Sequence, residues 1–368
     1  MSAPAAIRSV DSCSTATLVV DGRPLLSFGG SSYLGLGADP VIIEAGVDAL
    51  RRFGAHAQLG RHYGFGLAAN LDAEAEARRF FDVDGAMFFG TGYLFGLIAI
   101  GGLAAHCHAV FIDACAHYSL RDAARACGRP VHEFAHLDAA DLERVIAREL
   151  PAGARPLVAT DGMFPTRGAV APLADYAALL ARHDGWLVVD ESHAFGTIGE
   201  CGRGAVEQAR LPRERVLAGG SMAKAFGAHG GLAIGAASTI AALWGTPAAR
   251  GAALGCSAGA AMSAASMRQV RAKPDLLARM RRNASALRQG LRGLGLAVDA
   301  HDGPIVAVAH GSASNMQSIQ ARLLERGIFI AYSTYVGAGP AGVLRFAAFA
   351  DHCDADIQRL LDELRPLL

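Results

Sequence analysis

Lysine is almost missing from this chain. Its 34 basic residues comprise 32 arginines and only two lysines, Lys224 and Lys273. A lysine amine loses its proton when it is desolvated or lies beside another cation, whereas a guanidinium stays charged, so only the lysine can act as a nucleophile. Lys224 lies in a stretch of small residues, 217–231, that holds Phe226 and no acidic partner. This context favours a reactive Schiff-base lysine, with a solvent-exposed lysine in a glycine-rich loop as the alternative.

An excess of either charge is also lacking, since 34 basic and 34 acidic residues cancel. The balance argues against a nucleic-acid-binding surface. The seven cysteines are odd in number and contain no C-x-x-C pair, which indicates reduced thiols in a cytoplasmic protein rather than disulfides or a zinc site. The N-terminus has no basic segment followed by an apolar one, so we expect no signal peptide. No metal site is expected from these patterns.

Formal charge is absent from residues 225–249, a run long enough to cross a bilayer. The run is mostly Gly and Ala, which contribute little transfer free energy, and it contains His229, Trp244 and Pro247. We therefore expect a buried loop, strand and helix here rather than a membrane span.

The chain is long and 52% hydrophobic, which suits one large α/β domain plus a smaller one. A hairpin is expected at 18–27 and helices at 40–53 and 70–81. Strand and helix patterns then alternate, and this alternation predicts a mostly parallel, doubly wound sheet. The expected strands are 85–89, 109–113, 131–134, 156–160, 186–190, 216–219 and 232–235, and the expected helices between them are 92–105, 119–126, 138–150 and 172–183.

The C-terminal third has a different pattern. A long helical period at 263–291 is interrupted near Pro274, because proline cannot continue a helix. Short strands and helices follow at 305–308, 315–326, 328–330, 343–346 and 354–367. We therefore expect an N-terminal segment at 1–37, a large domain at 38–262 and a small α+β domain at 263–368.

Asp190 ends the most apolar strand pattern of the chain. A carboxylate at the C-terminal end of a strand lies where open α/β sheets bind ligands, although strands also end in Asp because turns favour it. One strand later comes Lys224. A pyridine ring used as an electron sink needs a covalent lysine at its aldehyde and a carboxylate at its ring nitrogen, so this pair of residues indicates such a cofactor.

Residues 90–96, Gly-Thr-Gly-Tyr-Leu-Phe-Gly, join a strand to a helix. Exposed N–H groups at the helix start can hold a phosphate. The segment is also close to a dinucleotide fingerprint, with Asp113 at about the right distance for a ribose contact, but its third glycine is one residue late. We favour a single-phosphate site and keep the dinucleotide site as an alternative.

Three further side chains are candidates on weaker grounds. His117 follows the strand that ends in Asp113 and is suited to stack on a planar cofactor, but a lone histidine is equally often an ordinary loop residue. Ser221 offers a hydroxyl to a phosphate, or is a turn serine. Arg345 has the planar fork that clamps a carboxylate, or forms a surface ion pair.

Together these residues resemble the α-oxoamine synthases, pyridoxal-phosphate (PLP) enzymes of the aminotransferase-like fold type I. They condense an amino acid with an acyl-CoA and release carbon dioxide. The resemblance covers nearly the whole chain from Phe28 onward. The segments that carry it are Ser32-Tyr-Leu-Gly-Leu36, Thr91-Gly92-Tyr93, His117, Thr160-Asp-Gly-Met-Phe164, Val189-Asp-Glu-Ser-His193, Ser221 with Lys224, Cys256-Ser257 and Arg345.

The resemblance implies roles for these positions. It makes Lys224, His117 and Asp190 the catalytic residues. It places Thr91, Gly92, Tyr93, His117, Asp190, His193, Ser221, Lys224 and Ser257 around PLP, and Arg345 and Ser32 near the substrate. Because Ser257 falls where the family reaches the neighbouring subunit's phosphate, it also implies a homodimer with the active site at the interface.

Several segments depart from the family pattern. A Gly/Ser-rich loop is replaced by residues 57–61, Pro165 stands where a serine lies near the ring hydroxyl, and 92–95 and 333–336 differ near the expected substrate. Three alternatives to the synthase therefore stay open: a PLP-dependent aminotransferase on the same fold, an NAD(P) oxidoreductase that uses the motif at 90–96, and a non-catalytic binding protein.

Overall fold

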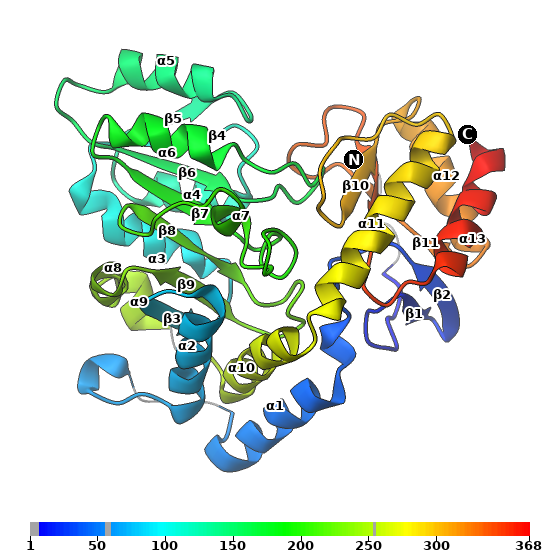
Figure 1. The fold of residues 1–368 in the computed structure, drawn as a ribbon, viewed down its shortest axis with the longest axis horizontal. Helices are drawn as coiled ribbons and strands as arrows, with labels where there is room; N and C mark the ends of the chain where they lie inside the picture. The colour runs from blue at the N-terminus through cyan, green and yellow to red at the C-terminus, as the bar shows by residue number, and fades with distance from the viewer. Residues whose placement is uncertain (1–6, 56–59, 253–254) are drawn as a thin grey trace.

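The computed structural model describes residues 7–55, 60–252 and 255–368. Residues 57–59 of the altered loop at 57–61 lie outside this part of the chain. In Figure 1 a large sheet and the helices that cover it occupy one side of the molecule. A smaller lobe, which contains both chain ends, occupies the other side. The long helix α11 lies on the smaller lobe and faces the large one.

A seven-stranded sheet forms the large lobe. From edge to edge its strands are β3 (Gly85–Phe89), β9 (Gly231–Gly235), β8 (Val216–Ser221), β7 (Trp186–Asp190), β6 (Pro156–Asp161), β4 (Ala109–Asp113) and β5 (Val131–Phe134). The antiparallel strand β9 separates β3 from β8, and the strands from β8 to β5 are parallel to one another. All seven expected strands form, each within two residues of its expected ends.

Alternating side chains along each strand supply two cores, one on each face of the sheet. On β4, for example, Val110 and Ile112 join one buried cluster, while Ala109 and Phe111 join the other. The first cluster lies under α3 (Leu94–Leu103), α4 (Tyr118–Ala126), α8 (Ala237–Leu243) and α9 (Pro247–Ala252). The second lies under α1 (Pro40–Phe53), α2 (Ala68–Phe81), α5 (Ala139–Glu149), α6 (Leu173–Ala181), α7 (Ala205–Gln208) and α10 (Ser257–Ala272). Helices on both faces confirm the doubly wound fold.

The uncharged run at 225–249 folds as expected, into a turn, strand β9, helix α8 and the start of α9. Within the residues described, no helix is both long and apolar enough to cross a membrane.

The C-terminal lobe is built on a second, smaller sheet. Strand β13 (Val343–Ala347) is its centre, with β10 (Ile305–Val308) and β12 (Ala331–Ser333) paired antiparallel on either side. Helices α11 (Asp275–Gly293), α12 (Ala313–Glu325) and α13 (Asp354–Leu364) pack around it. The small α+β unit predicted for this part of the chain is therefore present, with β12 as an additional strand.

The N-terminal hairpin belongs to the same lobe. Strands β1 (Thr17–Val20) and β2 (Arg23–Ser27) meet at Asp21 and Gly22, and both residues take the positive φ angles that tight hairpin turns require. Strand β11 (Ile328–Phe329) adds in parallel to β2. One end of the chain is thus tied to the other through a third sheet.

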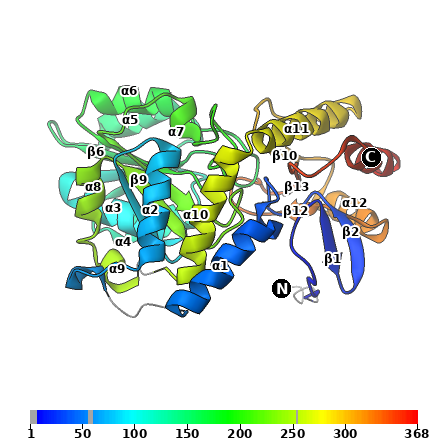
Figure 2. The same ribbon diagram turned by 60° about the horizontal axis from the view of Figure 1, so that its bottom comes forward.

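The division of the chain into three parts remains a proposal, with one boundary moved. The expected boundary between residues 262 and 263 falls inside α10, which continues to Ala272 and packs against α1 and α2 (Figure 2). The helix breaks at Lys273 and Pro274, where proline was predicted to interrupt it. We propose that the large unit ends at this break.

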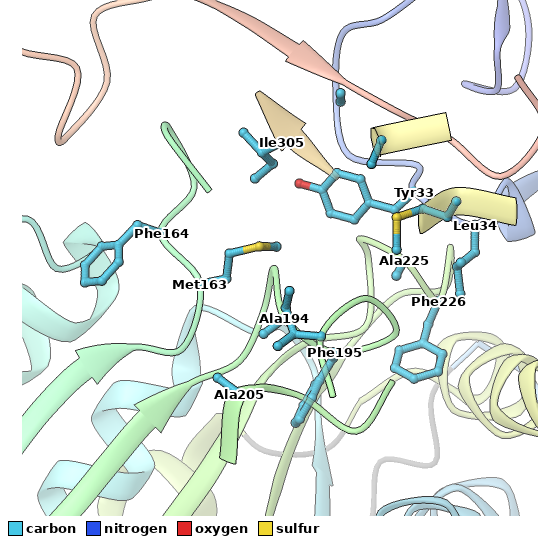
Figure 3. Packing of buried hydrophobic residues seen from close by; sticks show 14 of the residues in the cluster. Tyr33, Leu34, Met163, Phe164, Ala194, Phe195, Ala205, Ala225, Phe226 and Ile305 are labelled. Carbon is cyan, nitrogen blue, oxygen red and sulfur yellow. The ribbon is translucent and has the colours of Figure 1, made fainter. Parts of the chain in front are cut away.

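One core runs through all three parts. Figure 3 shows Tyr33 of the N-terminal segment beside Ile305 of β10, with Met163 and Ala194 from the large lobe nearby. These four residues belong to a single buried cluster. The two lobes are therefore joined by packed side chains, and these side chains hold the ends of β6 and β7 in place.

Candidate active site

The C-terminal ends of five strands meet at one edge of the large sheet. Chain segments that follow β3, β4, β6, β7 and β8 bring the predicted site residues there, as expected for an open α/β sheet. They are Thr91 and Gly92 after β3, His117 after β4, Asp190 and His193 at the end of β7, and Ser221 and Lys224 at the end of β8; strand β6 adds Asp161, which was not predicted.

Lys224 and Asp190 lie near enough at this edge for the charge of Asp190 to act on the lysine amine. Burial, with the nearby positive charge of Arg345, lowers the pKa of Lys224, while Asp190 acts on it in the opposite direction. Asp190 is 4% exposed, and burial raises the pKa of its carboxyl group. Its Oδ1 accepts from the backbone N–H of Ser192 at 2.9 Å. Within the described residues neither Lys224 nor Asp190 forms an ion pair, so neither group has an opposite charge in direct contact.

His117 lies over the same edge. It caps α4, because its Nδ1 accepts from the backbone N–H of Ser119 at 3.2 Å, and the Ser119 hydroxyl lies 2.7 Å from the same nitrogen. Burial lowers the pKa of His117, and the charge of Asp190 raises it. The Oη atom of Tyr335 lies 2.9 Å from its Nε2, which adds a contact from the small lobe that the sequence did not reveal.

The turn at Thr91-Gly92 has the shape of an anion cradle. It precedes α3, whose first two N–H groups, of Leu94 and Phe95, donate to the carbonyls of Thr91 and Gly92 and so hold the turn against the helix start. A Cβ on Gly92 would lie 2.5 Å from Cα of Ser221, so only glycine lets the turn approach the end of β8 this closely. Ser221 in turn donates its backbone N–H to the hydroxyl of Ser192 at 2.8 Å. The exposed ring of Tyr93 lies 6.2 Å from that of His117.

Arg345 enters the site from β13 and is 8% exposed. Its Nε donates to the carbonyl of Pro165 at 2.8 Å and one terminal nitrogen donates to the carbonyl of Gly30 at 2.9 Å. The other terminal nitrogen donates to Oη of Tyr33 at 3.2 Å. Five N–H groups minus these three bonds leave two for a ligand. Arg345 is thus no surface ion pair.

Asp161 was not among the predicted site residues, although it stands in the quoted segment 160–164. It is buried beside Asp190, its partner in the register of β6 and β7. Its Oδ2 accepts from the backbone N–H of His117 at 2.8 Å. Burial and then the neighbouring Asp190 raise its pKa well above the ordinary range, whereas the N–H of His117 lowers it.

Two predicted residues stand apart from this group in their contacts. Ser257 is buried at the start of α10, where its hydroxyl donates to the carbonyl of Gly54 of the same chain. Cys256 caps the same helix through its sulfur. Ser32 is partly exposed and directly precedes Tyr33; its carbonyl accepts from the backbone N–H of Gly35.

Asp113 is unsuited to a ribose contact, which weakens the dinucleotide alternative. Its carboxylate is fully buried and already accepts from the backbone N–H of Cys115 at 2.7 Å, from that of Leu137 at 3.0 Å and from Nδ1 of His136 at 2.8 Å. Asp113, Cys115 and His136 are close enough together to suggest a metal site. Nδ1 of His136 is instead hydrogen-bonded to the carboxylate of Asp113, so we read the cluster as a set of hydrogen bonds that holds the loops together.

Known proteins resemble this chain in sequence and in fold. The family model for aminotransferases of class I and II matches residues 23–364. The 8-amino-7-oxononanoate synthase of Thioalkalivibrio sulfidiphilus is 31% identical over 363 residues, which cover 97% of this chain and 92% of that protein. The enzyme of the same name from Aromatoleum aromaticum is 37% identical over 221 residues, 60% of this chain and 57% of its own length. Several other relatives are likewise matched over less than two thirds of their length.

Solved structures show the same fold. A serine palmitoyltransferase from S. paucimobilis, solved with PLP and myriocin, superposes with a TM-score of 0.90 at 26% identity, over 98% of this chain and 92% of that one. An 8-amino-7-oxononanoate synthase from Francisella tularensis, at 20% identity, superposes with a TM-score of 0.79 over 93% of this chain and 97% of that one.

Proposed function

The chain belongs to the class I and II aminotransferase family, among its α-oxoamine synthases, and on that premise we propose that it is a PLP-dependent acyltransferase. It condenses an amino acid with an acyl thioester such as an acyl-CoA, releases carbon dioxide and yields an α-amino ketone. The observation that carries the proposal is the meeting of a lysine amine of lowered pKa, Lys224, with a buried carboxyl group, Asp190, at one sheet edge.

The residues present fit PLP. Asp190 is buried without an ion-pair partner among the described residues, and a protonated pyridine nitrogen is the kind of donor that would stabilise its charged form. The close approach of Gly92 to Ser221 brings the end of β8 beside the turn that precedes α3, so the Ser221 hydroxyl and the backbone N–H groups of that turn could act on one phosphate. The half-buried, neutral ring of His117 lies over the same edge and is suited to pack on a planar ring.

When bound, PLP supplies an aldehyde that bonds to an amine and a ring that withdraws electrons from the substrate α-carbon. Nζ of Lys224 would hold the aldehyde and, once freed by the substrate amine, would be the base for the α-proton, since its lowered pKa favours the free amine. Asp190 keeps a proton on the ring nitrogen, and His193 donates to the ring oxygen. The hydroxyl of Ser221 and the N–H groups of Thr91, Gly92 and Tyr93 bind the phosphate.

Arg345 orients the substrate. Its guanidinium keeps two N–H groups for a carboxylate after its bonds to Pro165, Gly30 and Tyr33 are counted. Those bonds hold the fork rigid, so the substrate carboxylate is fixed at one distance from Lys224. Tyr335 lies beside His117, with its Oη 2.9 Å from Nε2 of that ring, and Ser32 directly precedes Tyr33, whose hydroxyl accepts from Arg345.

We also propose a homodimer with the active site at the interface. Helix α1 exposes Val41, Ile43 and Leu50, and the segment that follows exposes Tyr63 and Phe65, a concentration of apolar side chains that a second copy would cover. In such a dimer the start of α10, where Ser257 lies, would face the partner's phosphate, and the Ser257 hydroxyl would leave the carbonyl of Gly54 to reach it. The seven cysteines are unpaired, which supports the reducing cytoplasm as the compartment.

The first test uses the scarcity of lysine. Protein incubated with PLP is reduced with borohydride, digested and analysed by mass spectrometry. We expect the label on Lys224 alone. Lys273 is the matched control, because it is the other lysine of the chain and forms an ion pair with Asp39 at 3.0 Å. Lys224→Ala should remove the label and Lys273→Ala should keep it; a label retained in Lys224→Ala would overturn the assignment.

The second test separates the reaction classes. Purified protein is mixed with a panel of amino acids and acyl-CoAs, and free CoA and carbon dioxide are measured. Release of both supports the synthase. Turnover that needs a keto acid and releases no CoA would mean an aminotransferase, and PLP binding without any α-proton exchange in deuterium oxide would mean a non-catalytic binding protein.

A further inference from the structure

Three side chains from distant parts of the sequence form a continuous hydrogen-bonded row beside the proposed cofactor site. A terminal nitrogen of Arg345 lies 3.2 Å from Oη of Tyr33, and the same Oη lies 2.7 Å from Nδ1 of His193. Arg345 comes from the small lobe, Tyr33 from the N-terminal segment and His193 from the loop after β7. The ring of Tyr33 is fully buried in the core that joins these parts (Figure 3).

The direction of each bond in this row is determined by chemistry. A guanidinium has only donors, so Arg345 donates to the oxygen of Tyr33. The hydroxyl has one hydrogen, and because Tyr33 is shielded from water that hydrogen must go to its remaining neighbour, Nδ1 of His193. The opposite arrangement would leave a buried hydroxyl proton without an acceptor. Nδ1 of His193 is therefore unprotonated.

A neutral imidazole with an unprotonated Nδ1 carries its hydrogen on Nε2. Burial, followed by the positive charges of Lys224 and Arg345, lowers the pKa of His193 well below the ordinary range, which keeps the ring neutral. Its Nε2–H is then a fixed donor, free of the tautomer exchange that a histidine in water undergoes.

We propose that Tyr33 is a positioning residue that transmits the donor character of Arg345 to His193 and so fixes His193 as the Nε2–H tautomer. Under the proposed function, this is the tautomer that donates to the ring oxygen of PLP. The row also links the residue that binds the substrate carboxylate to the residue that binds the cofactor ring.

The test begins with the protein free of cofactor, so that it does not depend on PLP binding. Protein labelled with ¹⁵N-histidine is examined by long-range ¹H–¹⁵N correlation spectra at neutral pH, and the His193 signals are assigned by their loss in His193→Gln. We expect Nδ1 at the chemical shift of an unprotonated nitrogen and Nε2 at that of a protonated one. A protonated Nδ1 in the wild type overturns the proposal.

Tyr33→Phe removes the hydroxyl and keeps the ring. We expect the two nitrogen signals to move toward one another as both tautomers become populated. Tyr176→Phe is the matched control, since Tyr176 is equally buried in the same core but its hydroxyl has no hydrogen-bond partner in the structure. It should leave the His193 signals unchanged. Signals in Tyr33→Phe identical to those of the wild type would show that Tyr33 does not set the tautomer.

Arg345→Met gives a second, independent measurement. Without the guanidinium, no obligatory donor reaches the Tyr33 hydroxyl. The hydroxyl oxygen can then accept from Nδ1–H of His193, so we expect mixed tautomers here as well. A wild-type pattern in this variant would remove Arg345 from the proposal.

A final measurement uses PLP itself. The dissociation constant of PLP should rise in Tyr33→Phe, by about twofold if the two tautomers become equally populated, because only the fraction with Nε2–H then donates, and it should be unchanged in Tyr176→Phe. If the wild type binds no PLP, the proposed function fails while the tautomer result stands. If PLP binds but the tautomer is wrong, only the present inference fails.

Discussion

At the level of single residues, strand β7 ends in two consecutive buried carboxyl groups with different surroundings. Asp190 faces the proposed cofactor site, whereas Glu191 points behind it and accepts from the backbone N–H groups of Ala205 and Val206 at 2.9 and 2.8 Å. Burial raises the pKa of Glu191 to about 7. Glu191 therefore titrates near neutral pH while it holds the loop that follows β7.

This shift makes a prediction about stability. The folded-state pKa of Glu191 lies above its ordinary value of 4.5, so its contribution to stability is fully present below about pH 4.5 and is lost as the pH rises through about 7. In Glu191→Gln this dependence should disappear. We expect the free energy of unfolding, measured by urea denaturation at pH 5 and pH 8, to fall less in the variant than in the wild type. Equal falls in both proteins would contradict the assignment.

At the level of secondary structure, two glycines in and before helix α3 answer different requirements. Gly92 precedes the helix and touches the backbone of Ser221, whereas Gly101 lies within the helix with no atom near its missing Cβ. The first glycine serves the proposed phosphate site, and the second only weakens the helix.

Exchanging each glycine for alanine tests this difference. Gly92→Ala places a methyl group against main-chain atoms that cannot rotate away, so we expect the affinity for PLP to fall at least about tenfold, measured by fluorescence titration. Gly101→Ala is the control, and it should raise the free energy of unfolding by about 0.5–1 kcal/mol with unchanged affinity. Unchanged affinity in Gly92→Ala would place the phosphate elsewhere.

Helix α10 shows why element boundaries were harder to predict than elements. The sequence indicated a helix from residue 263, but the helix begins at Ser257. Residues 257–261 are Ser, Ala and Gly, which give no apolar period to recognise. Their small size instead serves packing, because a Cβ on Gly259 would lie 2.6 Å from the carbonyl of His229. Tertiary contact, not local pattern, decides where this helix starts.

At the level of the whole molecule, the surface of α1 predicts self-association. Ile43→Glu and Leu50→Glu place charges on the exposed apolar face, whereas Val131→Glu places one on the edge strand β5, where a similar valine is exposed. By light scattering we expect a dimer for the wild type and for Val131→Glu, and monomers for the two α1 variants. A monomeric wild type, or dimers in all four proteins, would contradict an interface on α1.

The sequence predicted the sheet and most of the site, because strand-end residues such as Asp190 and Lys224 follow recognisable local patterns. It did not predict the partners of those residues. Tyr33, His193 and Arg345 are separated by 160 and 312 positions along the chain, and no local pattern records that they touch. Tyr335 and Asp161 were missed for the same reason: each stood inside a quoted segment, but only the packed structure shows which of its residues turn toward His117.

The parallel pairing of β2 with β11 has a consequence for how the protein is made. Ser27 is translated about 300 residues before its neighbour Phe329. At roughly 5–20 residues per second, the hairpin waits on the order of 15–60 s on the ribosome for the strand that completes its sheet. The central lobe has left the exit tunnel by then, so the amino-terminal strands are the part most exposed to chaperones and proteases during translation.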